Sequence, residues 1–540
     1  MSEKIPERMI IPQQIEAGLR ELGVTPGMTL VVHSALKKIG WIPGGALSVV
    51  QALLAVLGPN GTLVMPAQTG ENSDPAFWRH PPVPESWWEE IRRVRPPYDP
   101  VLTPTRKMGA VVECFRAFPG VLRSSHPTCS FIARGPAAEA ILSRHDLEDS
   151  LGENSPCGAL AAADAHILLL GVDFDNCTVM HLAEYRSKCR LMFTQSATVI
   201  RDGQRENVSY PDIDMNSDEF LEPGRVLEAA GLVRQSKIGE ADLRLFRVRD
   251  AVAAAESWMR KNRMRRLDES DRDRVMAYLK KEPEYNLFLI GDIENFGMST
   301  DFQDIMAFEK DGEIDSILLR YHHSFIPYSS NPEFETAPLL SALDTPVLHI
   351  MSGKQSVIDR LMPHLEGFDY KSSYLMKLGR GDLIEGDSRP EPEGVVLSAA
   401  TIDDVPAMVD FVAGVVEFTH MGTRQERITQ MNISFEKNAI HYYLYKHQEQ
   451  IIAIAGTTAE NSISAMVVSV ATDPAWRGRG LASGLVTALA KNLLADQMEY
   501  LCLFYNNPEA GRIYRRLGFR DAGEWIMVPR AEKETEAATC

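Results

Sequence analysis

A glycine-rich turn in the last third of the chain has the features of a phosphate-binding site. Residues 473–482 (Asp-Pro-Ala-Trp-Arg-Gly-Arg-Gly-Leu-Ala) follow an apolar, strand-like run at 466–470 and precede a helical pattern at 485–494. Glycines let the backbone approach an anion closely, and the N–H groups and dipole at a helix N-terminus bind negative charge. The candidate ligands are Arg477, Gly478, Arg479, Gly480, Leu481 and Ala482. The segment predicts a strand, a turn and a helix that hold a phosphate-bearing cofactor.

A second motif follows this turn at residues 507–519 (Asn-Pro-Glu-Ala-Gly-Arg-Ile-Tyr-Arg-Arg-Leu-Gly-Phe). The Arg-x-x-Gly-x-Ala frame of the turn, together with Asn-x-x-Ala-x-x-x-Tyr-x-x-x-Gly-Phe, resembles the GNAT superfamily of acetyl-CoA-dependent N-acetyltransferases. The resemblance implies that the bound phosphate is the pyrophosphate of coenzyme A. It also implies that Asn507 lies on the cofactor side and that Tyr514 protonates the departing thiolate.

Acetyl transfer to an amine needs an anchored cofactor, a neutral amine and a proton for the leaving thiolate. The phenol of Tyr514 suits the last task, because its ordinary pKa of about 10 is close to that of an alkyl thiol. Glu460, at the end of the strand pattern 451–458, could bind or deprotonate the amine. An acidic residue in a turn is an equally good interpretation of Glu460.

In the N-terminal part, a histidine and a glutamate are spaced for general-base chemistry. The segment 176–185 (Asn-Cys-Thr-Val-Met-His-Leu-Ala-Glu-Tyr) follows the strand pattern 167–170. Thr178 is a predicted N-cap, and His181 and Glu184, three residues apart, share one helix face. A carboxylate on one imidazole nitrogen fixes the tautomer and stabilises the imidazolium once the other nitrogen has taken a proton. The pair predicts a base, although a pair of this spacing taken alone is most often a surface contact.

Short motifs precede this pair in a characteristic order: His-Ser-Ala-Leu at 33–36, Gly-Thr-Leu-Val-Met-Pro at 61–66, Thr-Pro-Thr at 103–105, Arg-Ser-Ser-His-Pro at 123–127 and Ser-Pro at 155–156. The succession, over residues 11–255, resembles the aminoglycoside 3-N-acetyltransferase family, whose fold is unrelated to GNAT. The resemblance implies that His181 is the general base and Glu184 its partner. It places Ser34 beside the acetyl-CoA cleft, and Asp99, Glu113 and His126 beside the substrate. Family members usually carry a second serine where this chain has Ala35.

The order of strand and helix patterns around these residues indicates an α/β (α+β) fold class. The first block alternates strand patterns (29–32, 62–65, 167–170) with helical patterns (47–57, 137–142), as in a layered α/β fold. The later blocks mix helices with strands such as 316–320 and 347–351. With the two resemblances, we expect an antibiotic acetyltransferase fold followed by a tandem GNAT fold with mixed sheets flanked by helices.

Two segments have the composition of domain boundaries. Residues 260–266 form a basic run, and Gly381–Gly394 contains prolines and several acids. They predict an aminoglycoside 3-N-acetyltransferase-like domain at 1–262, a degenerate GNAT-like half at 267–385 and a GNAT domain at 395–530. The middle block lacks the glycine-rich turn and the Asn/Tyr pair.

Composition narrows the class of protein. The 540 residues exceed what one core serves, and 44% hydrophobic and 24% charged content is typical of soluble protein. No apolar run approaches the roughly 20 residues of a membrane span, and no signal peptide is visible, so we expect a cytoplasmic protein without a membrane partner. The net charge of −18 disfavours nucleic acid and suits a small cationic amine. Seven cysteines without Cys-x-x-Cys spacing argue against a disulfide framework or a metal site.

These patterns favour a bifunctional enzyme with two unrelated acetyl-CoA-dependent N-acetyltransferase modules. The first would act on an aminoglycoside-type amino sugar, and the second on the same molecule or on another amine. One alternative is a biosynthetic N-acyltransferase of a secondary metabolite. Another makes one module a non-catalytic binding or scaffold unit. The sequence leaves the oligomeric state open, and a homo-oligomer is compatible with it.

Overall fold

The computed structural model describes residues 9–78, 81–384, 391–414, 423–437, 439–496 and 498–531. The chain divides into two compact units, unit 1 (Met1–Arg266) and unit 2 (Leu267–Cys540). Residues 385–390 of the predicted connector lie outside the described residues. Among the helices of the described ranges, none is long and apolar enough to cross a membrane.

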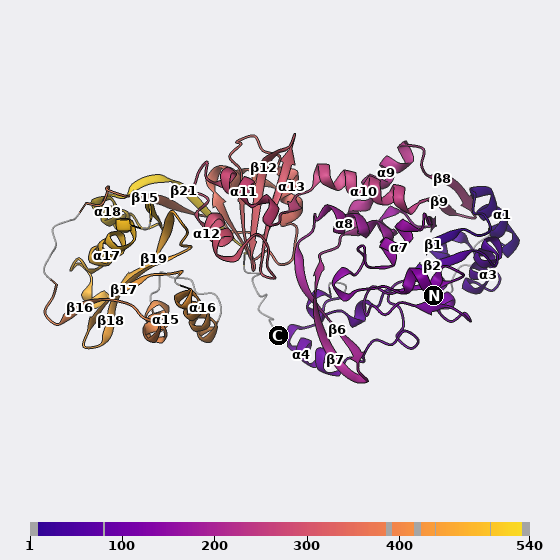
Figure 1. Cartoon of the computed structure of the whole chain (residues 1–540), viewed down its shortest axis with the longest axis horizontal. Coiled ribbons are helices and arrows are strands. Elements are labelled where there is room, and N and C mark those ends of the chain that lie inside the picture. The colour runs from indigo at the N-terminus through magenta and orange to yellow at the C-terminus, as the bar shows by residue number, and fades with distance from the viewer. Residues whose placement is uncertain are drawn as a thin grey trace, which may run out of the picture. The chain divides into compact units, whose positions relative to one another are not determined.

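Unit 1 is built on a seven-stranded sheet of order β3-β4-β2-β1-β5-β9-β8. Figure 1 labels its strands β1, β2, β8 and β9. The strands are β1 (Thr29–Ser34), β2 (Thr62–Pro66), β3 (Leu122–Arg123), β4 (Phe131–Arg134), β5 (His166–Leu170), β8 (Arg234–Ile238) and β9 (Ala241–Arg247). The central strands β2, β1 and β5 run parallel, whereas β4 and β9 are antiparallel to their central neighbours. The carboxyl ends of the three parallel strands therefore meet at one edge, where ligands bind in open α/β sheets.

Helices cover both faces of this sheet. Neighbouring residues of a strand point to opposite faces, and here both sets of side chains are apolar. Leu30 and Val32 of β1 join one core with three helices: α1 (Pro12–Leu22), α3 (Ala46–Leu57) and α5 (Ala110–Arg116). Val31 joins the opposite core with α6 (Ala138–Leu142), α7 (Pro156–Ala162), α8 (His181–Ser187), α9 (Leu221–Ala229) and α10 (Val248–Asn262). Two shorter helices are α2 (Leu36–Ile39) and α4 (Trp88–Val94). The expected layered α/β fold is confirmed.

The helix that carries His181 begins later than the sequence predicts. Thr178 lies in a 3₁₀ turn, Thr178–Met180, and α8 starts at His181. After α8, the chain forms a two-stranded hairpin of β6 (Met192–Arg201) and β7 (Gln204–Ile213). The predicted N-cap at Thr178 is therefore wrong, because a tighter turn supplies the entry to the helix.

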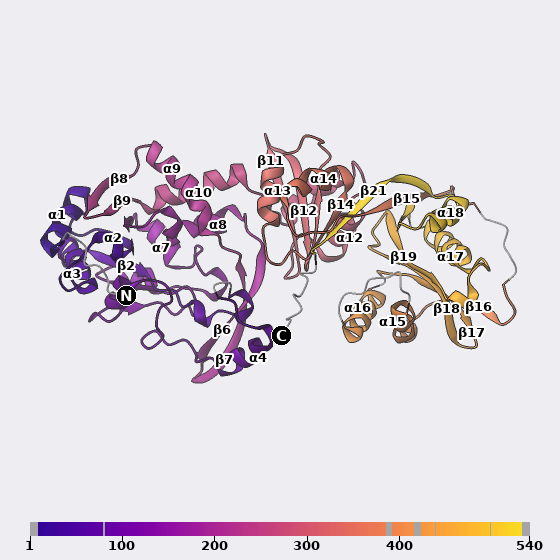
Figure 2. The ribbon, with the colours of Figure 1, turned by 180° about the vertical axis from the view of Figure 1, so that it is seen from behind.

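In unit 2, one continuous sheet runs in the order β11-β12-β13-β14-β21-β15-β20-β19-β18-β17-β16. The strands are β11 (Gln303–Lys310), β12 (Glu313–Tyr321), β13 (Ser324–Tyr328), β14 (Ile350–Lys354), β15 (Lys371–Gly379), β16 (Val395–Ala399), β17 (Tyr442–His447), β18 (Gln450–Thr458), β19 (Ser464–Thr472), β20 (Tyr500–Tyr505) and β21 (Arg520–Pro529). Figure 2 shows β21, the last strand in the sequence, between β14 and β15. The last strand of unit 2 is therefore inserted between two strands that precede it by more than 100 residues in the sequence.

Most neighbours in this sheet are antiparallel, but each half contains one parallel pair, β13 with β14 and β19 with β20. The helices are α11 (Arg272–Leu279), α12 (Leu287–Phe296), α13 (Thr336–Leu343), α14 (Gln355–Leu361), α15 (Val405–Ala413), α16 (Arg424–Glu436), α17 (Leu481–Asp496) and α18 (Pro508–Arg516). A helix joins the strands of each parallel pair: α13 in the first half and α17 in the second. Only α17 follows a glycine-rich turn.

Candidate active sites

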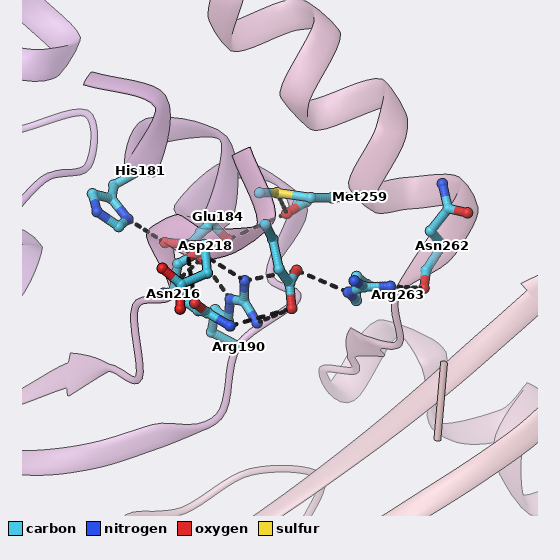
Figure 3. Close-up of polar contacts among 10 residues, drawn as sticks. His181, Glu184, Arg190, Asn216, Asp218, Met259, Asn262 and Arg263 are labelled. Atoms are coloured by element: carbon cyan, nitrogen blue, oxygen red, sulfur yellow. Dashed lines mark hydrogen bonds and ion pairs between the residues drawn. The ribbon is translucent and has the colours of Figure 1, made fainter. Parts of the chain in front are cut away.

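His181 and Glu184 form a buried, hydrogen-bonded pair at the start of α8 (Figure 3). The distance from His181 Nδ1 to Glu184 Oε2 is 2.5 Å, and the two residues are 8% and 0% exposed. A carboxylate only accepts hydrogen bonds, so Nδ1 carries the proton and Nε2 is the acceptor of the ring. The contact expected from the three-residue spacing is present, and it leaves the imidazole in the tautomer that a general base requires.

A chain of ionic contacts extends from this pair. Arg190 Nε donates to Glu184 Oε1 at 2.5 Å, and the backbone N–H of Asn216 donates to the same oxygen at 3.1 Å. Arg190 also contacts Glu219 at 2.9 Å, and Arg263 Nε donates to Glu219 at 2.8 Å (Figure 3). Both oxygens of Glu184 are therefore occupied, so its carboxylate is held in one orientation toward the imidazole.

This network keeps Glu184 ionised inside the protein. Burial by itself raises the pKa of a carboxyl group, but His181 and Arg190 outweigh that effect, and the pKa of Glu184 is lowered. The same reasoning holds for Arg190: burial alone would lower its pKa, yet Glu184 and Glu219 raise it. A fixed negative charge beside His181 stabilises the imidazolium that forms when the ring accepts a proton.

His33 and Ser34 end β1 at the carboxyl edge of the sheet. His33 Nε2 and Ser34 Oγ are both buried and have no hydrogen-bond partner within the described ranges of the chain. Burial, and secondarily the charge of His181, lower the pKa of His33 to about 3, so its ring is neutral at physiological pH. Buried polar atoms are rarely left unpaired without a role, so these two atoms fit a polar ligand such as acetyl-CoA. Ser34 is among the site residues predicted from the sequence and His33 is not, although a histidine at the end of an apolar strand is a signal of a polar site.

Two predicted substrate contacts, Asp99 and Glu113, are engaged in local structure. Asp99 Oδ1 accepts the backbone N–H groups of Val101 and Leu102 at 2.8 Å each. Glu113 accepts the N–H of Thr105 at 2.7 Å and pairs with Arg116 at 3.0 Å. Burial would raise the pKa of Glu113, but these partners lower it. Both carboxylates shape loops, and their contact with a substrate stays a prediction.

His126 lies in a buried polar cluster. Its Nδ1 accepts the N–H of Cys129 at 3.0 Å, and its Nε2 is 3.1 Å from Ser150 Oγ, which donates to Asp212 at 2.8 Å. Burial, with His145 as a further cause, lowers the pKa of His126 to about 3. Both ring nitrogens therefore have partners inside the protein. This arrangement is typical of a histidine that joins loops, and its role at the substrate stays a prediction.

In unit 2, the glycine-rich turn joins β19 to α17 as the sequence predicts. Gly478 and Gly480 have φ angles of 76° and 86°, which glycine adopts without strain. Residues 477–480 are exposed, and Gly480 directly precedes the 16-residue helix α17. The turn thus presents backbone at the positive end of a long helix, the arrangement that binds phosphate.

The two arginines of this turn are exposed, whereas the residues that follow Gly480 are buried or half-buried. Arg477 Nε donates to the carbonyl of Thr472 at 3.2 Å, and the guanidinium of Arg479 lies 4.7 Å from the ring centre of Trp476. Leu481 is buried in the core of unit 2, and Ala482 is half-buried. The two arginines can supply positive charge at the turn, whereas Leu481 can contribute only its backbone.

Tyr514 lies in α18, beside the point where β19 and β20 separate. These strands pair from Ser464–Tyr500 to Val467–Leu503, although β19 continues to Thr472. Tyr514 belongs to the core cluster that contains Val467 and Leu503. Burial raises its pKa to about 12, so the phenol keeps its proton at neutral pH.

Asn507 and Glu460 both have partners. Asn507 is the N-cap of α18, and its side-chain oxygen accepts the N–H of Glu509 at 2.9 Å. Glu460 is buried and contacts His441 Nδ1 at 2.9 Å. Cofactor contact by Asn507 stays a prediction, and Glu460 proves to be one member of a second histidine–glutamate pair.

Comparison with known proteins separates the same two regions. Residues 31–260 match the family described as aminoglycoside 3-N-acetyltransferase. Over 264 residues the chain is 44% identical to the SPbeta prophage-derived aminoglycoside N(3′)-acetyltransferase-like protein YokD of Bacillus subtilis (strain 168), covering 97% of that protein and 48% of this chain. The chain belongs to the aminoglycoside 3-N-acetyltransferase family. Residues 438–521 of this family member match the GNAT acetyltransferase domain.

Other relatives of this acetyltransferase also align with its N-terminal half. Aminoglycoside N(3)-acetyltransferase IX of Micromonospora chalcea is 32% identical over 267 residues, which cover 92% of that protein and 46% of this chain. Aminoglycoside N(3)-acetyltransferase IV of Salmonella sp is 35% identical over 238 residues, covering 82% of that protein and 44% of this chain. The crystal structure of YokD matches with a TM-score of 0.47 and the same coverage as its sequence. The protein is an acyltransferase, and acetyltransferases of both families use acetyl-CoA.

The glycine-rich turn gives a direct test of cofactor binding in unit 2. Replacing Gly480 by alanine should weaken acetyl-CoA binding to this unit about tenfold. A left-handed backbone costs a non-glycine residue roughly 1–2 kcal/mol, so the turn should relax and move its N–H groups away from the phosphate. Equilibrium dialysis would measure the dissociation constant. Gly312→Ala is the matched control, since Gly312 has a φ of 85° with open space around it on the β11–β12 hairpin. Equal affinity of Gly480→Ala and Gly312→Ala for acetyl-CoA would contradict a role of this turn.

Proposed function

We propose that the chain carries two acetyl-CoA-dependent N-acetyltransferase sites, one in each unit. The N-terminal site acetylates an amino group of an aminoglycoside-type amino sugar, with His181 as the general base. The C-terminal site acetylates the same molecule or another amine. The proposal is carried by the His181–Glu184–Arg190 chain and by the buried His33 Nε2 and Ser34 Oγ, which have no hydrogen-bond partner in the described part of the chain. Its relatives, aminoglycoside N(3)-acetyltransferases IX and IV, support the substrate class.

In the N-terminal site, acetyl-CoA supplies an acetyl group activated as a thioester. His181 Nε2 accepts the proton of the attacking amine, while Glu184 and Arg190 hold the ring and stabilise its positive charge. Ser34 Oγ and His33 Nε2 are the polar atoms able to bind the cofactor at the end of β1. The amine forms an amide bond as the carbon–sulfur bond breaks, and the proton held by His181 is available for the leaving thiolate.

The overall charge of the protein favours this substrate class. A net charge of −18 concentrates cations near the surface, and aminoglycosides carry several protonated amines. Steering of this kind weakens as salt increases. A cytoplasmic location and a homo-oligomer remain part of the prediction.

The test is acetyl transfer by the purified chain. We expect thiol release from acetyl-CoA in the presence of gentamicin or sisomicin, with one acetyl group added to the product for each thiol released in the N-terminal reaction. Mass spectrometry would identify the product. If acetyl-CoA binds but no aminoglycoside is acetylated, the amino-sugar assignment fails, and a biosynthetic N-acyltransferase becomes the better interpretation.

Tyr514 gives a separate prediction for the C-terminal site. Tyr514→Phe should lower kcat of the C-terminal reaction by about 10²-fold, the lower end of a general acid's contribution. Acetyl-CoA affinity should be unchanged, since the ring is retained. Tyr370→Phe removes an exposed hydroxyl of the same unit and should leave kcat as it is. Full activity of Tyr514→Phe on an amine that only unit 2 acetylates would exclude Tyr514 as the proton donor.

A further inference from the structure

Unit 2 contains a second histidine–carboxylate pair, formed by residues far apart in the sequence. His441 Nδ1 lies 2.9 and 3.0 Å from the two oxygens of Glu460. Glu460 is 8% exposed, whereas the His441 side chain is 30% exposed. Because Nδ1 faces the carboxylate, Nε2 is the acceptor that the ring can offer to a substrate.

The carboxylate of this pair is fixed by its surroundings. Thr457 donates its hydroxyl to Glu460, and the backbone carbonyl of Glu460 accepts Asn295 Nδ2 of α12 at 3.0 Å. Nearby on α12, Glu294 accepts the N–H and hydroxyl of Ser462. With its oxygens engaged by His441 and Thr457, Glu460 is poorly placed to bind a substrate itself. The imidazole is the more exposed end of the pair.

Strand register connects the pair to the point where the sheet opens. The N–H of Thr457 donates to the carbonyl of His441 at 2.8 Å, Thr457 is opposite Val467, and Val467 is opposite Leu503. Val467–Leu503 is the last paired position of β19 and β20. His441 thus begins the row of residues that ends at the separation of these strands. The backbone of His441 is two strand spacings, about 10 Å, from β19. An imidazole ring together with one bridging amine or water can span this distance.

Tyr514 shares a core cluster with the residues at the other end of this row. Leu503 and Val467 belong to the same core cluster as Tyr514, and β20 leads through Asn507 into α18. His441 therefore begins the row that ends at the opening between β19 and β20, and Tyr514 packs in the core cluster that contains the last two residues of this row. Acetyl transfer needs such a pair, a base for the amine and an acid for the thiolate.

We propose that His441 is the general base of the C-terminal acetyltransferase site and that Glu460 is its positioning residue. This assignment rests on the proposed function of unit 2. His441 Nε2 takes the proton of the substrate amine as the nitrogen–carbon bond forms. The carbon–sulfur bond breaks, and Tyr514 gives its proton to the departing sulfur. Both units would then use a histidine held by a glutamate, on unrelated folds.

The first experiment locates the base with a reactive cofactor and needs no known amine. Bromoacetyl-CoA is incubated with the full chain carrying His181→Gln, so that the base of unit 1 is absent. We expect a bond between His441 Nε2 and the methylene carbon, with loss of bromide, found by peptide mass spectrometry. Excess acetyl-CoA, or replacement of His441 by glutamine, should abolish this label. A label at another residue of unit 2, or none although acetyl-CoA binds, overturns the assignment.

The second experiment measures turnover in the same His181→Gln chain, with spermidine and sisomicin as probes. His441→Gln should lower kcat by about 10²–10⁴-fold without changing the dissociation constant of acetyl-CoA. His364→Gln, which alters an exposed histidine of the same unit, is the control. Undiminished turnover in His441→Gln overturns the proposal.

Glu460→Gln distinguishes positioning from a merely structural role. Glu460 raises the pKa of His441, despite the opposite effect of burial. Glu294 on α12 holds Ser462, and Lys437 lies 5.0 Å from the ring centre of Phe296 on the same helix. Since only the neutral ring is a base, kcat/KM should rise with pH, and Glu460→Gln should move this rise to lower pH. An unmoved profile overturns the role of Glu460. Equilibrium dialysis measures separately whether unit 2 binds acetyl-CoA. If it does not bind, the proposed acetyltransferase function of unit 2 is wrong, whatever the role of His441.

Discussion

Replacing His181 by glutamine is expected to lower kcat for aminoglycoside acetylation by about 10²–10⁴-fold, the usual contribution of a general base. The substrate amine is largely protonated at neutral pH, and its proton must leave as the amide forms. His181 Nε2 is available for that proton because Nδ1 is held by Glu184. Glutamine keeps much of the side-chain size but has no basic nitrogen. Initial rates of thiol release between pH 6 and 9, with product masses, measure the effect.

A histidine on the central sheet of unit 1 provides the control. His166 begins β5 at the amino edge, opposite the edge where Ser34 ends β1. His166→Gln should therefore leave kcat and acetyl-CoA binding unchanged. If His181→Gln acetylates the aminoglycoside as fast as His166→Gln across this pH range, the general-base role of His181 is wrong.

Replacing Glu184 by glutamine is expected to lower the free energy of unfolding of unit 1 by about 3–5 kcal/mol, as removal of one partner from a buried ion pair does. Glu184 is fully buried, and Arg190 would lose its contact with Glu184 while keeping Glu219 as an acidic partner. The imidazole would also lose the charge that stabilises its protonated form, so kcat should fall as well. Urea denaturation followed by circular dichroism measures the stability.

The pH dependence of this loss follows from the direction of the pKa shift. The pKa of Glu184 is lower in the folded protein than its unfolded value of about 4.3. Its stabilising contribution is therefore fully present above that pH and is lost as the pH falls through the folded pKa. The stability difference between wild type and Glu184→Gln should narrow at acidic pH.

An exposed pair is the control for this prediction. Glu222 and Arg225 form an ion pair on α9, and both side chains are more than half exposed. Glu222→Gln should cost less than about 1 kcal/mol. A loss in Glu184→Gln no larger than in Glu222→Gln would mean that the buried network contributes little to stability.

The hydrophobic and glycine patterns of the sequence predict much of the local structure. The strand runs near Thr29, Thr62 and Ile167, and the glycine-rich turn before α17, occur as predicted, because alternation of apolar residues and glycine punctuation are local signals. The start of α8 was misplaced by two residues, because a 3₁₀ turn, which is common at helix N-termini, precedes the helix. The interleaving of β21 between β14 and β15 has no local signature, since it depends on pairing between distant strands.

The sequence by itself determined the family motifs, the His181–Glu184 contact and the strand–turn–helix around Gly480. These features depend on residues within a few positions of one another, whose geometry is set by the helix or turn itself. The tertiary structure decided which distant groups join them. Arg190 and Glu219 complete the first pair, His33 approaches it from another strand, and His441 meets Glu460 across β17 and β18. Such partners are selected by sheet register and core packing, which no short stretch of sequence specifies.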